Sequence, residues 1–213
     1  MKIVIFGATG RIGSRIVNEA LSRGHEVTAA VRRPEDYTPE APQLKVAKSD
    51  LFNSQDVESA VFDHYAVVSA FNYKEGVNPP STITEVAAPL LNGLKQAGVK
   101  RLLVIGGAGS LKGSTGEQLV DLPDFPAAYK ASALAQREAL KLYQNEKEIE
   151  WTYLSPAAEI APGKRTGKFR TGKDEVITGE NGHSFISMED LAVAVIDELE
   201  NPMHIRERFT VGY

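Results

Sequence analysis

Apolar residues along the chain are arranged in two alternating ways, as short unbroken runs and as one-sided stretches with a helical repeat. The unbroken runs predict buried β-strands, and the one-sided stretches predict amphipathic helices. The predicted strands span residues 3–6, 25–31, 44–47, 66–70, 101–105 and 150–154, and the predicted helices span 12–21, 54–62, 81–97 and 127–144. Strands that alternate with helices predict a parallel sheet with right-handed connections and helices on both faces.

The ends of the predicted helices carry residues that favour starting or stopping a helix. Gly24 and Gly98 follow the first and third helices, and glycine is favoured there because it accepts the left-handed backbone that ends a helix. Ser54 is suited to cap the second helix, since its hydroxyl oxygen can accept a hydrogen bond from a free backbone N–H. Pro89 is expected to kink or interrupt the third helix, because proline lacks the N–H that a helix interior needs.

The last third of the chain has a different pattern. Residues 157–182 contain five glycines and many lysines and arginines, which predicts loops and short β-ribbons. Residues 187–190 have the form of a capping box that opens a further helix, with Leu191, Val195 and Leu199 on its buried face. Residues 208–211 are predicted to form an edge strand.

Three glycines with the spacing Gly7-x-x-Gly10-x-x-Gly13 lie between the first strand and the first helix. In a dinucleotide-binding unit, Gly7 would make the tight turn, Gly10 would let the backbone approach a pyrophosphate, and Gly13 would let helix and strand pack closely. Free N–H groups at the helix start would hold the phosphates. The whole turn is therefore a candidate coenzyme site: Gly7, Ala8, Thr9, Gly10, Arg11, Ile12 and Gly13. The alternative is a glycine-rich turn in an unrelated α/β protein.

Pattern and motif together predict an α/β fold, a Rossmann-type doubly wound parallel sheet in a single domain of residues 1–213. Residues 1–156 would form the NAD(P)-binding core, and residues 157–213 a small C-terminal extension on the substrate side. A chain of 213 residues is long enough for one domain with a substantial core.

The amino-acid composition excludes several classes of function. A net charge of −4 argues against a nucleic-acid surface, and no apolar run approaches the length of a membrane span or a signal peptide. The absence of cysteine excludes disulfides and thiolate chemistry, and the four histidines lack metal-ligand spacing. We therefore expect a cytoplasmic protein, a monomer or homodimer, with no metal and with a small-molecule acceptor as its partner.

Arg32 and Arg33 follow the second strand, at the place that lies beside the adenosine ribose in a dinucleotide site. An acidic residue at this place selects NAD, whereas an arginine accommodates the 2′-phosphate of NADP, and no acidic residue occurs before Glu35. The sequence therefore predicts NADP(H) over NAD(H). The alternative is that both arginines are solvated surface charges.

Further candidates follow the third to sixth strands, because ligands bind outside the carboxyl ends of such strands. Asp50 and Leu51 would meet the adenine, although Asp50 could instead serve only as a helix-start residue. The glycines at 106–109 would let the nicotinamide and its ribose lie flat against the sheet, or form only a flexible loop. The remaining candidate contacts are Ala70, Phe71, Asn72, Gly106, Gly107 and Pro156.

With these segments the chain resembles the atypical short-chain dehydrogenase/reductase family, and most closely its small NAD(P)H-binding NADH-flavin reductase group, with a more distant likeness to biliverdin-IXβ/flavin reductase. The resemblance covers essentially the whole chain. The matching segments are residues 7–13, 31–34, 97–102, 151–156, 165–168, 186–192 and 208–213. The resemblance implies a reductase that uses a nicotinamide coenzyme.

One departure from the larger family concerns its Tyr-x-x-x-Lys motif, in which tyrosine donates a proton and lysine lowers the tyrosine pKa. Here Tyr129 is followed four residues later by Ala133, and Lys130 lies a quarter-turn away around the helix. Tyr129 and Ser110 remain the candidate catalytic residues. Ser110 matches a pocket serine of the biliverdin-IXβ/flavin reductases, and the alternative for Tyr129 is a plain aromatic residue at the helix start that lines the pocket. The histidine of those enzymes has no counterpart in residues 156–159.

Loss of the proton-donating motif favours an acceptor that needs no dedicated acid. Hydride transfer to a flavin or quinone spreads charge over a conjugated system, whereas a carbonyl substrate needs a positioned acid. We therefore expect a reductase of a flat conjugated acceptor such as FMN, which would bind between residues 106–126 and 157–182, with Phe71, Tyr73, Phe125 or Tyr129 available for stacking. The alternative is a non-catalytic NADP(H) sensor; an epimerase or dehydratase is disfavoured for want of acid/base groups.

Overall fold

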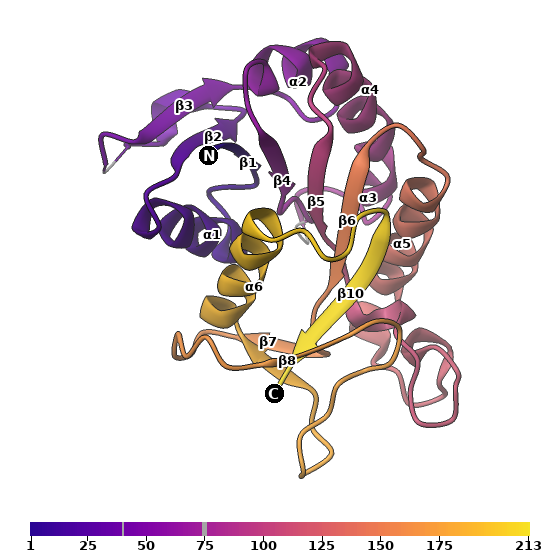
Figure 1. Ribbon diagram of the computed structural model, residues 1–213. Coiled ribbons are helices and arrows are strands. Elements are labelled where there is room, and N and C mark those ends of the chain that lie inside the picture. Colours follow the sequence, from indigo (N-terminus) through magenta and orange to yellow (C-terminus); the bar gives the residue numbers. More distant parts are fainter. Residues whose placement is uncertain (40, 74–75) are drawn as a thin grey trace.

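The central sheet has eight strands. The computed structural model describes residues 1–39, 41–73 and 76–213, and its strands lie in the order β3-β2-β1-β4-β5-β6-β10-β8 (Figure 1). All neighbours pair in parallel except β8, which is antiparallel to β10. The bounds are β1 Lys2–Phe6, β2 Glu26–Val31, β3 Leu44–Lys48, β4 Ala66–Ser69, β5 Arg101–Ile105, β6 Glu150–Ser155, β8 Arg170–Gly172 and β10 Glu207–Gly212. A separate parallel pair joins β7 Glu159–Ala161 to β9 Phe185–Ser187.

Helices cover both faces of this sheet, which is the Rossmann-type arrangement that the sequence predicted (Figure 1). One face carries α1 (Arg11–Ser22) and α6 (Met188–Glu200), which pack against each other. The other carries α2 (Ser54–Val61), α3 (Thr82–Glu85), α4 (Ala87–Ala97) and α5 (Ala127–Gln144). Single 3-10 turns occur at Pro34–Asp36, Ala108–Ser110 and Leu119–Asp121.

The unbroken apolar runs of the sequence follow from burial on both faces. Successive side chains of a strand point to opposite faces. Ile3 and Ile5 of β1 therefore pack in the cluster under α1 and α6, whereas Val4 and Phe6 pack in the cluster under α2, α4 and α5. All four side chains are buried.

The strand order reverses between β1 and β4. The chain passes from β1 outward to β2 and β3, and then returns to the other side of β1 to build β4, β5 and β6. At such a switch point the loops after two neighbouring strands separate to opposite faces and leave a crevice at the carboxyl edge of the sheet. Both the glycine turn after β1 and the loop after β4 lie at this edge.

One predicted helix detail is wrong and another is confirmed. The N-cap of α2 is Asn53, whose side-chain oxygen accepts hydrogen bonds from the N–H groups of Gln55 and Asp56, and Ser54 is already the first helical residue. The predicted interruption of the 81–97 helix by Pro89 is confirmed, and the break falls at Val86. The break precedes the proline because its ring clashes with the carbonyl four residues earlier, which is that of Glu85.

The prediction of an edge strand at 208–211 is also wrong, because β10 lies between β6 and β8. Its register pairs Phe209 with Leu154 on one side and Val211 with Thr171 on the other. Ser187 is confirmed as the N-cap of α6, since its hydroxyl oxygen accepts a hydrogen bond from the Asp190 N–H at 3.0 Å, but the reciprocal half of the capping box is replaced, because the Ser187 N–H donates to the Tyr213 hydroxyl at 3.3 Å. No helix within the described part of the chain is long and apolar enough to span a membrane.

Candidate coenzyme and acceptor site

The glycine turn after β1 is shaped by contacts that allow no side chain. Gly7 has a φ angle of +77°, and a Cβ atom there would lie 2.6 Å from the carbonyl oxygen of Ala70. A Cβ atom on Gly13 would lie 2.0 Å from the carbonyl oxygen of Gly7, so α1 packs directly on the turn. Gly7 and Gly13 thus have the geometric roles that the motif predicted, a tight turn and close helix packing.

Gly10 leaves the amino end of α1 open. It is the N-cap residue, no side chain caps the helix, and the first turn holds no acidic residue. Thr9, Gly10 and Arg11 are all exposed, whereas Ala8 is buried and Ile12 half-buried. Unpaired N–H groups and the positive end of the helix dipole favour an anion at this place. The turn therefore fits a dinucleotide pyrophosphate.

The two arginines after β2 differ in their contacts. Arg33 forms an ion pair with Asp36 at 2.8 Å. Arg32 is exposed and has no ion-pair partner among residues 1–39, 41–73 and 76–213. Arg32 is consequently the guanidinium that is available to a phosphate beside the end of β2.

Asp50 and Leu51 lie directly after β3. Leu51 is buried, and one carboxylate oxygen of Asp50 accepts a hydrogen bond from the Phe52 N–H at 3.1 Å. Because Asn53 caps α2, the helix-start interpretation of Asp50 is wrong in detail: its carboxylate closes the turn before the cap. The contact of Asp50 and Leu51 with an adenine stays a prediction.

The loops after β4, β5 and β6 meet around a pocket of about 440 Å³. Asn72, Gly106, Gly107 and Pro156 line it, whereas Ala70 lies against the glycine turn and Phe71 packs on the core. The remaining lining residues come from the loop before α5, from α5 itself and from the chain after β6: Ala108, Gly109, Leu119, Leu122, Asp124, Phe125, Pro126, Tyr129, Ser132, Ala133, Gln136, Ala157, Ala158 and Ile160. The pocket thus lies between the two segments that the sequence singled out.

The glycines after β5 have a packing role that neither sequence interpretation included. A Cβ atom on Gly106 would lie 1.9 Å from the ring of Tyr153, and one on Gly109 would lie 2.6 Å from the Cβ of Ala133. These glycines let the loop lie flat on β6 and α5. The loop is therefore held against the sheet next to the pocket rather than left as a flexible segment.

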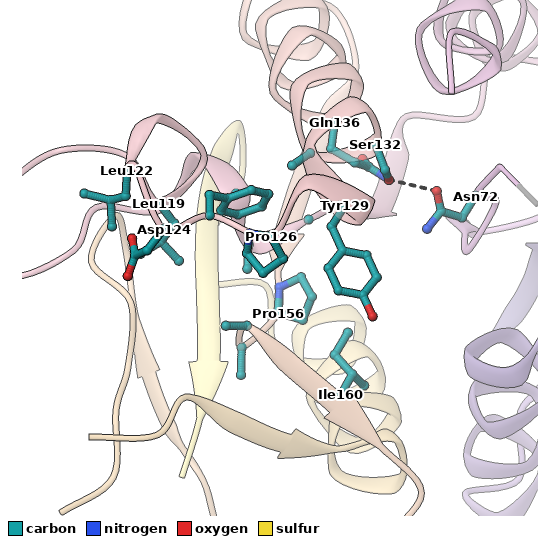
Figure 2. A pocket seen from close by; sticks show the side chains of 18 residues that line it. Asn72, Leu119, Leu122, Asp124, Pro126, Tyr129, Ser132, Gln136, Pro156 and Ile160 are labelled. Carbon is teal, nitrogen blue, oxygen red and sulfur yellow. Dashed lines mark hydrogen bonds between the residues drawn. The ribbon is translucent and has the colours of Figure 1, made fainter. Parts of the chain in front are cut away.

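The two candidate catalytic residues occupy different environments. Ser110 is buried and is not among the pocket-lining residues, and both its hydroxyl and carbonyl oxygens accept hydrogen bonds from the Arg208 guanidinium, at 2.9 and 3.0 Å. Tyr129 lines the pocket at the start of α5 and is 66% exposed (Figure 2). Their catalytic roles stay predictions.

Lys130 does not replace the missing motif lysine. Its amine donates a hydrogen bond to the Val120 carbonyl oxygen and lies 5.7 Å from the centre of the Phe125 ring. The lysine thereby ties the loop before α5 to the helix, and this loop forms one wall of the pocket.

Gln136 is a buried residue that lines the pocket from α5 and was not among the predicted site residues. Its amide nitrogen is 3.5 Å from the side-chain oxygen of Asn72 (Figure 2). The signal that could have revealed it is the helical spacing of residues 129, 132, 133 and 136, which places them on one face of the helix.

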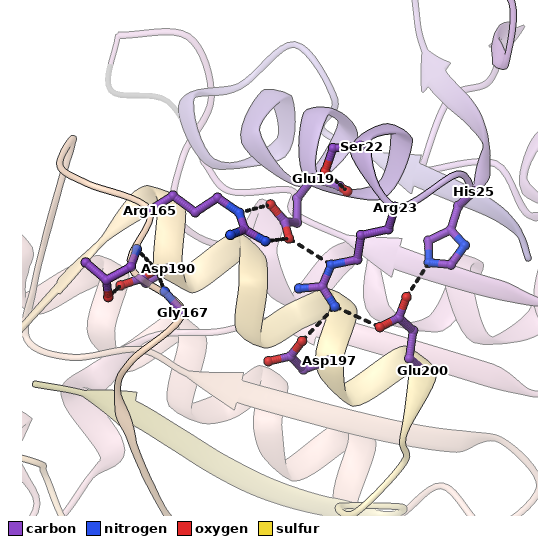
Figure 3. Close-up of polar contacts among 10 residues, drawn as sticks. Glu19, Ser22, Arg23, His25, Arg165, Gly167, Asp190, Asp197 and Glu200 are labelled. Atoms are coloured by element: carbon purple, nitrogen blue, oxygen red, sulfur yellow. Dashed lines mark hydrogen bonds and ion pairs between the residues drawn. The ribbon is translucent and has the colours of Figure 1, made fainter.

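The segment after β7 is tied to α1 and α6 by charged side chains. Arg165 forms two hydrogen bonds of 2.7 Å with Glu19 of α1, and Arg23 bridges Glu19 to Asp197 and Glu200 of α6 (Figure 3). The Arg165 guanidinium, followed by that of Arg23, holds the pKa of the Glu19 carboxyl below its ordinary value. We name Glu19, Arg23, Arg165, Asp197 and Glu200 the α1–α6 charge network.

Asp190 anchors the same segment from the side of α6. Its carboxylate accepts hydrogen bonds from the Thr166 N–H and hydroxyl, the Gly167 N–H and the Tyr213 hydroxyl. Burial raises the pKa of Asp190, but these hydrogen bonds outweigh burial and leave the pKa below its ordinary value.

In the described part of the chain, no group of three or more acidic or histidine side chains is placed to hold a metal ion.

The switch point, the open start of α1 and the pocket beyond β5 together define a Rossmann-type dinucleotide-binding protein. Comparison with known proteins gives the family. The chain belongs to the NAD(P)H-binding family, whose model matches residues 7–202.

Three similar proteins match nearly the whole chain. The "Uncharacterized protein YwnB" of Bacillus subtilis (strain 168) is 44% identical over 99% of this chain and 98% of its own length. A solved structure of a "putative epimerase" from Bacteroides thetaiotaomicron is 46% identical, with a TM-score of 0.91 over 100% of this chain and 96% of that one. A "putative NADH-flavin reductase" from Streptococcus pneumoniae is 35% identical, with a TM-score of 0.86 over 100% and 99% of the two chains.

Proposed function

We propose that the chain is an NADPH-dependent reductase that passes hydride to a flat conjugated acceptor such as a flavin or a quinone. The observation that carries this proposal is the pocket of about 440 Å³ beyond β5, whose walls are mainly apolar and which lacks a Tyr-x-x-x-Lys pair. The bound coenzyme would supply a hydride ion, and the acceptor would take up one further proton from water.

The chain's own residues would bind and orient both molecules. The open amino end of α1 would hold the coenzyme pyrophosphate, and Arg32 would pair with a 2′-phosphate, for which the guanidinium is well matched. The wall formed by residues 119–126, which Lys130 ties to α5, would exclude water from the acceptor. Phe125 and Tyr129 would offer aromatic surface for stacking.

The composition of the pocket favours reduction over epimerisation. An epimerase or dehydratase needs positioned acid and base groups within reach of the substrate. Among the lining residues only Asp124 and Tyr129 have ionisable side chains, and both residues are exposed. The description "putative NADH-flavin reductase" of the Streptococcus pneumoniae relative agrees with the reductase proposal.

Oxidation of NADPH, followed by the loss of nicotinamide absorbance, tests this function directly. FMN, riboflavin, menadione and a simple aldehyde would be offered separately, with NADH as the coenzyme control. We expect turnover with flavins or menadione and none with the aldehyde. Turnover with the aldehyde alone would contradict the proposal, and tight NADPH binding without turnover on any acceptor would instead indicate a coenzyme sensor.

A further inference from the structure

Two side-chain amides meet at one side of the otherwise mainly apolar pocket. Gln136 of α5 is 6% exposed, and Asn72 follows β4. The Gln136 amide nitrogen and the Asn72 side-chain oxygen are 3.5 Å apart, at the outer limit of a hydrogen bond (Figure 2). The Gln136 NH₂ group has two N–H donors and the Asn72 oxygen accepts from one of them, so the second N–H can be offered to a polar ligand atom in the pocket.

A buried tyrosine fixes the orientation of Gln136. Tyr153 of β6 is 1% exposed, and its hydroxyl lies 2.7 Å from the Gln136 side-chain oxygen and 2.9 Å from the Gln136 backbone carbonyl oxygen, with the side-chain oxygen as the nearer acceptor. Burial raises the pKa of Tyr153 well above its ordinary value, so the hydroxyl keeps its proton and acts as a donor. Because the oxygen end of the amide is occupied by this donor, the NH₂ end is directed toward Asn72.

Asn72 is oriented by the backbone. Its side-chain oxygen accepts a hydrogen bond from the Tyr73 N–H at 2.9 Å, and the same oxygen faces Gln136. The Asn72 nitrogen therefore lies on the other side of the amide, as Figure 2 shows. Since Asn72 is exposed, this NH₂ group is accessible to a ligand.

We infer that the amide N–H groups of Gln136 and Asn72 form a donor pair that binds a carbonyl oxygen of the acceptor. This inference rests on the proposed function and narrows its substrate class to flat ring systems that bear a carbonyl, such as quinones and isoalloxazines. A carbonyl oxygen conjugated to the reduced ring gains negative charge when the ring receives hydride. Donors that are already in place stabilise that charge without reorganisation.

The decisive comparison uses a flat ligand with carbonyl groups and one without. Lumiflavin and phenazine are both three-ring systems, and only lumiflavin carries carbonyl oxygens. Binding of each to the protein saturated with NADP⁺ would be measured by calorimetry in the wild type and in Gln136→Leu. Gln144→Leu is the matched control, because it makes the same exchange at an exposed position of the same helix.

We expect Gln136→Leu to weaken lumiflavin binding roughly 10-fold and to leave phenazine binding within about 2-fold, as loss of one hydrogen bond implies. NADP⁺ affinity should not change. Equal losses for both ligands would overturn the inference, since they would show a general defect of the pocket. A matching loss of NADP⁺ affinity would also overturn it, because the amides would then bind the coenzyme's own carboxamide.

A second variant keeps the test valid if Gln136→Leu does not fold. Tyr153→Phe removes the hydroxyl that fixes the amide and leaves Gln136 in place, so lumiflavin binding should weaken by about 3-fold while phenazine binding stays the same. Failure of the proposed function gives a different result. If the wild-type protein binds lumiflavin more tightly than phenazine but oxidises no NADPH, the donor pair is supported and the reductase function is rejected. Wild-type protein that binds lumiflavin no better than phenazine would overturn the donor pair.

Discussion

Gly7 and Gly24 have nearly the same backbone conformation, with φ angles of +77° and +79°, but their surroundings differ. A Cβ atom on Gly24 would meet nothing within 4 Å, whereas one on Gly7 would collide with the Ala70 carbonyl. The Gly7 position therefore needs glycine for two reasons, the left-handed backbone and the close approach of two loops. Of these two reasons, only the close approach of the two loops is connected with the crevice at the switch point.

Substitution by alanine separates these two effects. Gly24→Ala should lower the free energy of unfolding by about 1 kcal/mol, the cost of the left-handed backbone alone. Gly7→Ala should cost roughly 3 kcal/mol or more, because steric overlap adds to the strain. Urea unfolding of both variants checks the difference, and equal costs would mean that the contact with Ala70 is easily relieved.

Arg32 is predicted to set coenzyme preference. Arg32→Ala should raise the Kd for NADPH by roughly 10- to 100-fold, the worth of a charge-assisted hydrogen bond, and should leave the Kd for NADH unchanged. Arg33→Ala is the control and should have a smaller effect, because Arg33 is paired with Asp36. Calorimetric titration with both coenzymes provides the measurement; equal weakening of NADPH and NADH in Arg32→Ala would contradict the assignment.

Tyr129 is predicted to matter little as an acid. Tyr129→Phe should keep the rate of quinone reduction within about 3-fold, whereas loss of a true general acid typically costs at least 100-fold. Steady-state kinetics with menadione give the answer. A drop of the larger size would show that the proton comes from Tyr129 and not from water.

At the scale of elements, α1 carries both the coenzyme turn and one side of the α1–α6 charge network. Its amino end begins at the glycine turn, and Glu19 and Arg23 near its carboxyl end connect it to α6 and to the segment after β7. Ion pairs thus connect the segment after β7 to α1, the helix that begins at the candidate coenzyme site. The acceptors in these ion pairs are carboxylates, so the stability that the ion pairs contribute depends on pH.

The pH dependence of stability follows from Glu19 and Asp190. Both have folded-state pKa values below their ordinary values of 4.5 and 3.8. A lowered folded-state pKa stabilises the protein above the ordinary value, and this contribution is lost as pH falls through the folded-state value. The free energy of unfolding should therefore be level above about pH 5 and should decline below it.

Glu19→Gln is the variant that isolates the network. It should lower the free energy of unfolding at neutral pH by about 2 kcal/mol, because hydrogen bonds to charged groups are lost, and it should flatten the decline at acid pH. Glu85→Gln, at an exposed position of α3, is the matched control and should change neither quantity. If the free energy of unfolding of Glu19→Gln declines at acid pH as steeply as that of the wild type, other carboxyl groups are responsible for the decline.

The elements that could be predicted from sequence are those whose burial shows in the pattern of apolar residues within the element itself. The parallel strands β1, β2, β4, β5 and β6 are buried on both faces and therefore appear as apolar runs, whereas the edge strand β3 is only partly buried. The error at β10 arose because its outer neighbour β8 is three residues, Arg-Thr-Gly, with no apolar pattern. The interruption of the third helix could be predicted from Pro89, and the break itself falls three residues before the proline.

The candidate site divides in the same way. The glycine turn is local, so its spacing alone predicts the turn and the helix packing that the structure has. The pocket walls come from residues 72, 106–109, 119–126, 129–136 and 156–160, and their meeting depends on the tertiary fold. Gln136 was missed because its helical spacing with Tyr129 and Ser132 indicates a shared helix face, but only the tertiary fold brings Asn72 and Tyr153 to that face.

At the scale of the whole molecule, coenzyme turn and acceptor pocket lie along one edge of the sheet. The turn follows β1, and the pocket follows β4, β5 and β6, which are the next three strands in the sheet. A coenzyme laid along this edge would have its pyrophosphate at α1 and its nicotinamide at the pocket. The opposite edge of the sheet, with Phe62, Tyr65 and Val99, would remain untouched.

Hydrogen–deuterium exchange with and without NADPH tests this placement most directly. The account predicts slower exchange in residues 7–13 and 105–108, and no change in residues 62–65 and 97–99. Protection at the second pair of segments, or none at residues 7–13 under saturating NADPH, would contradict it.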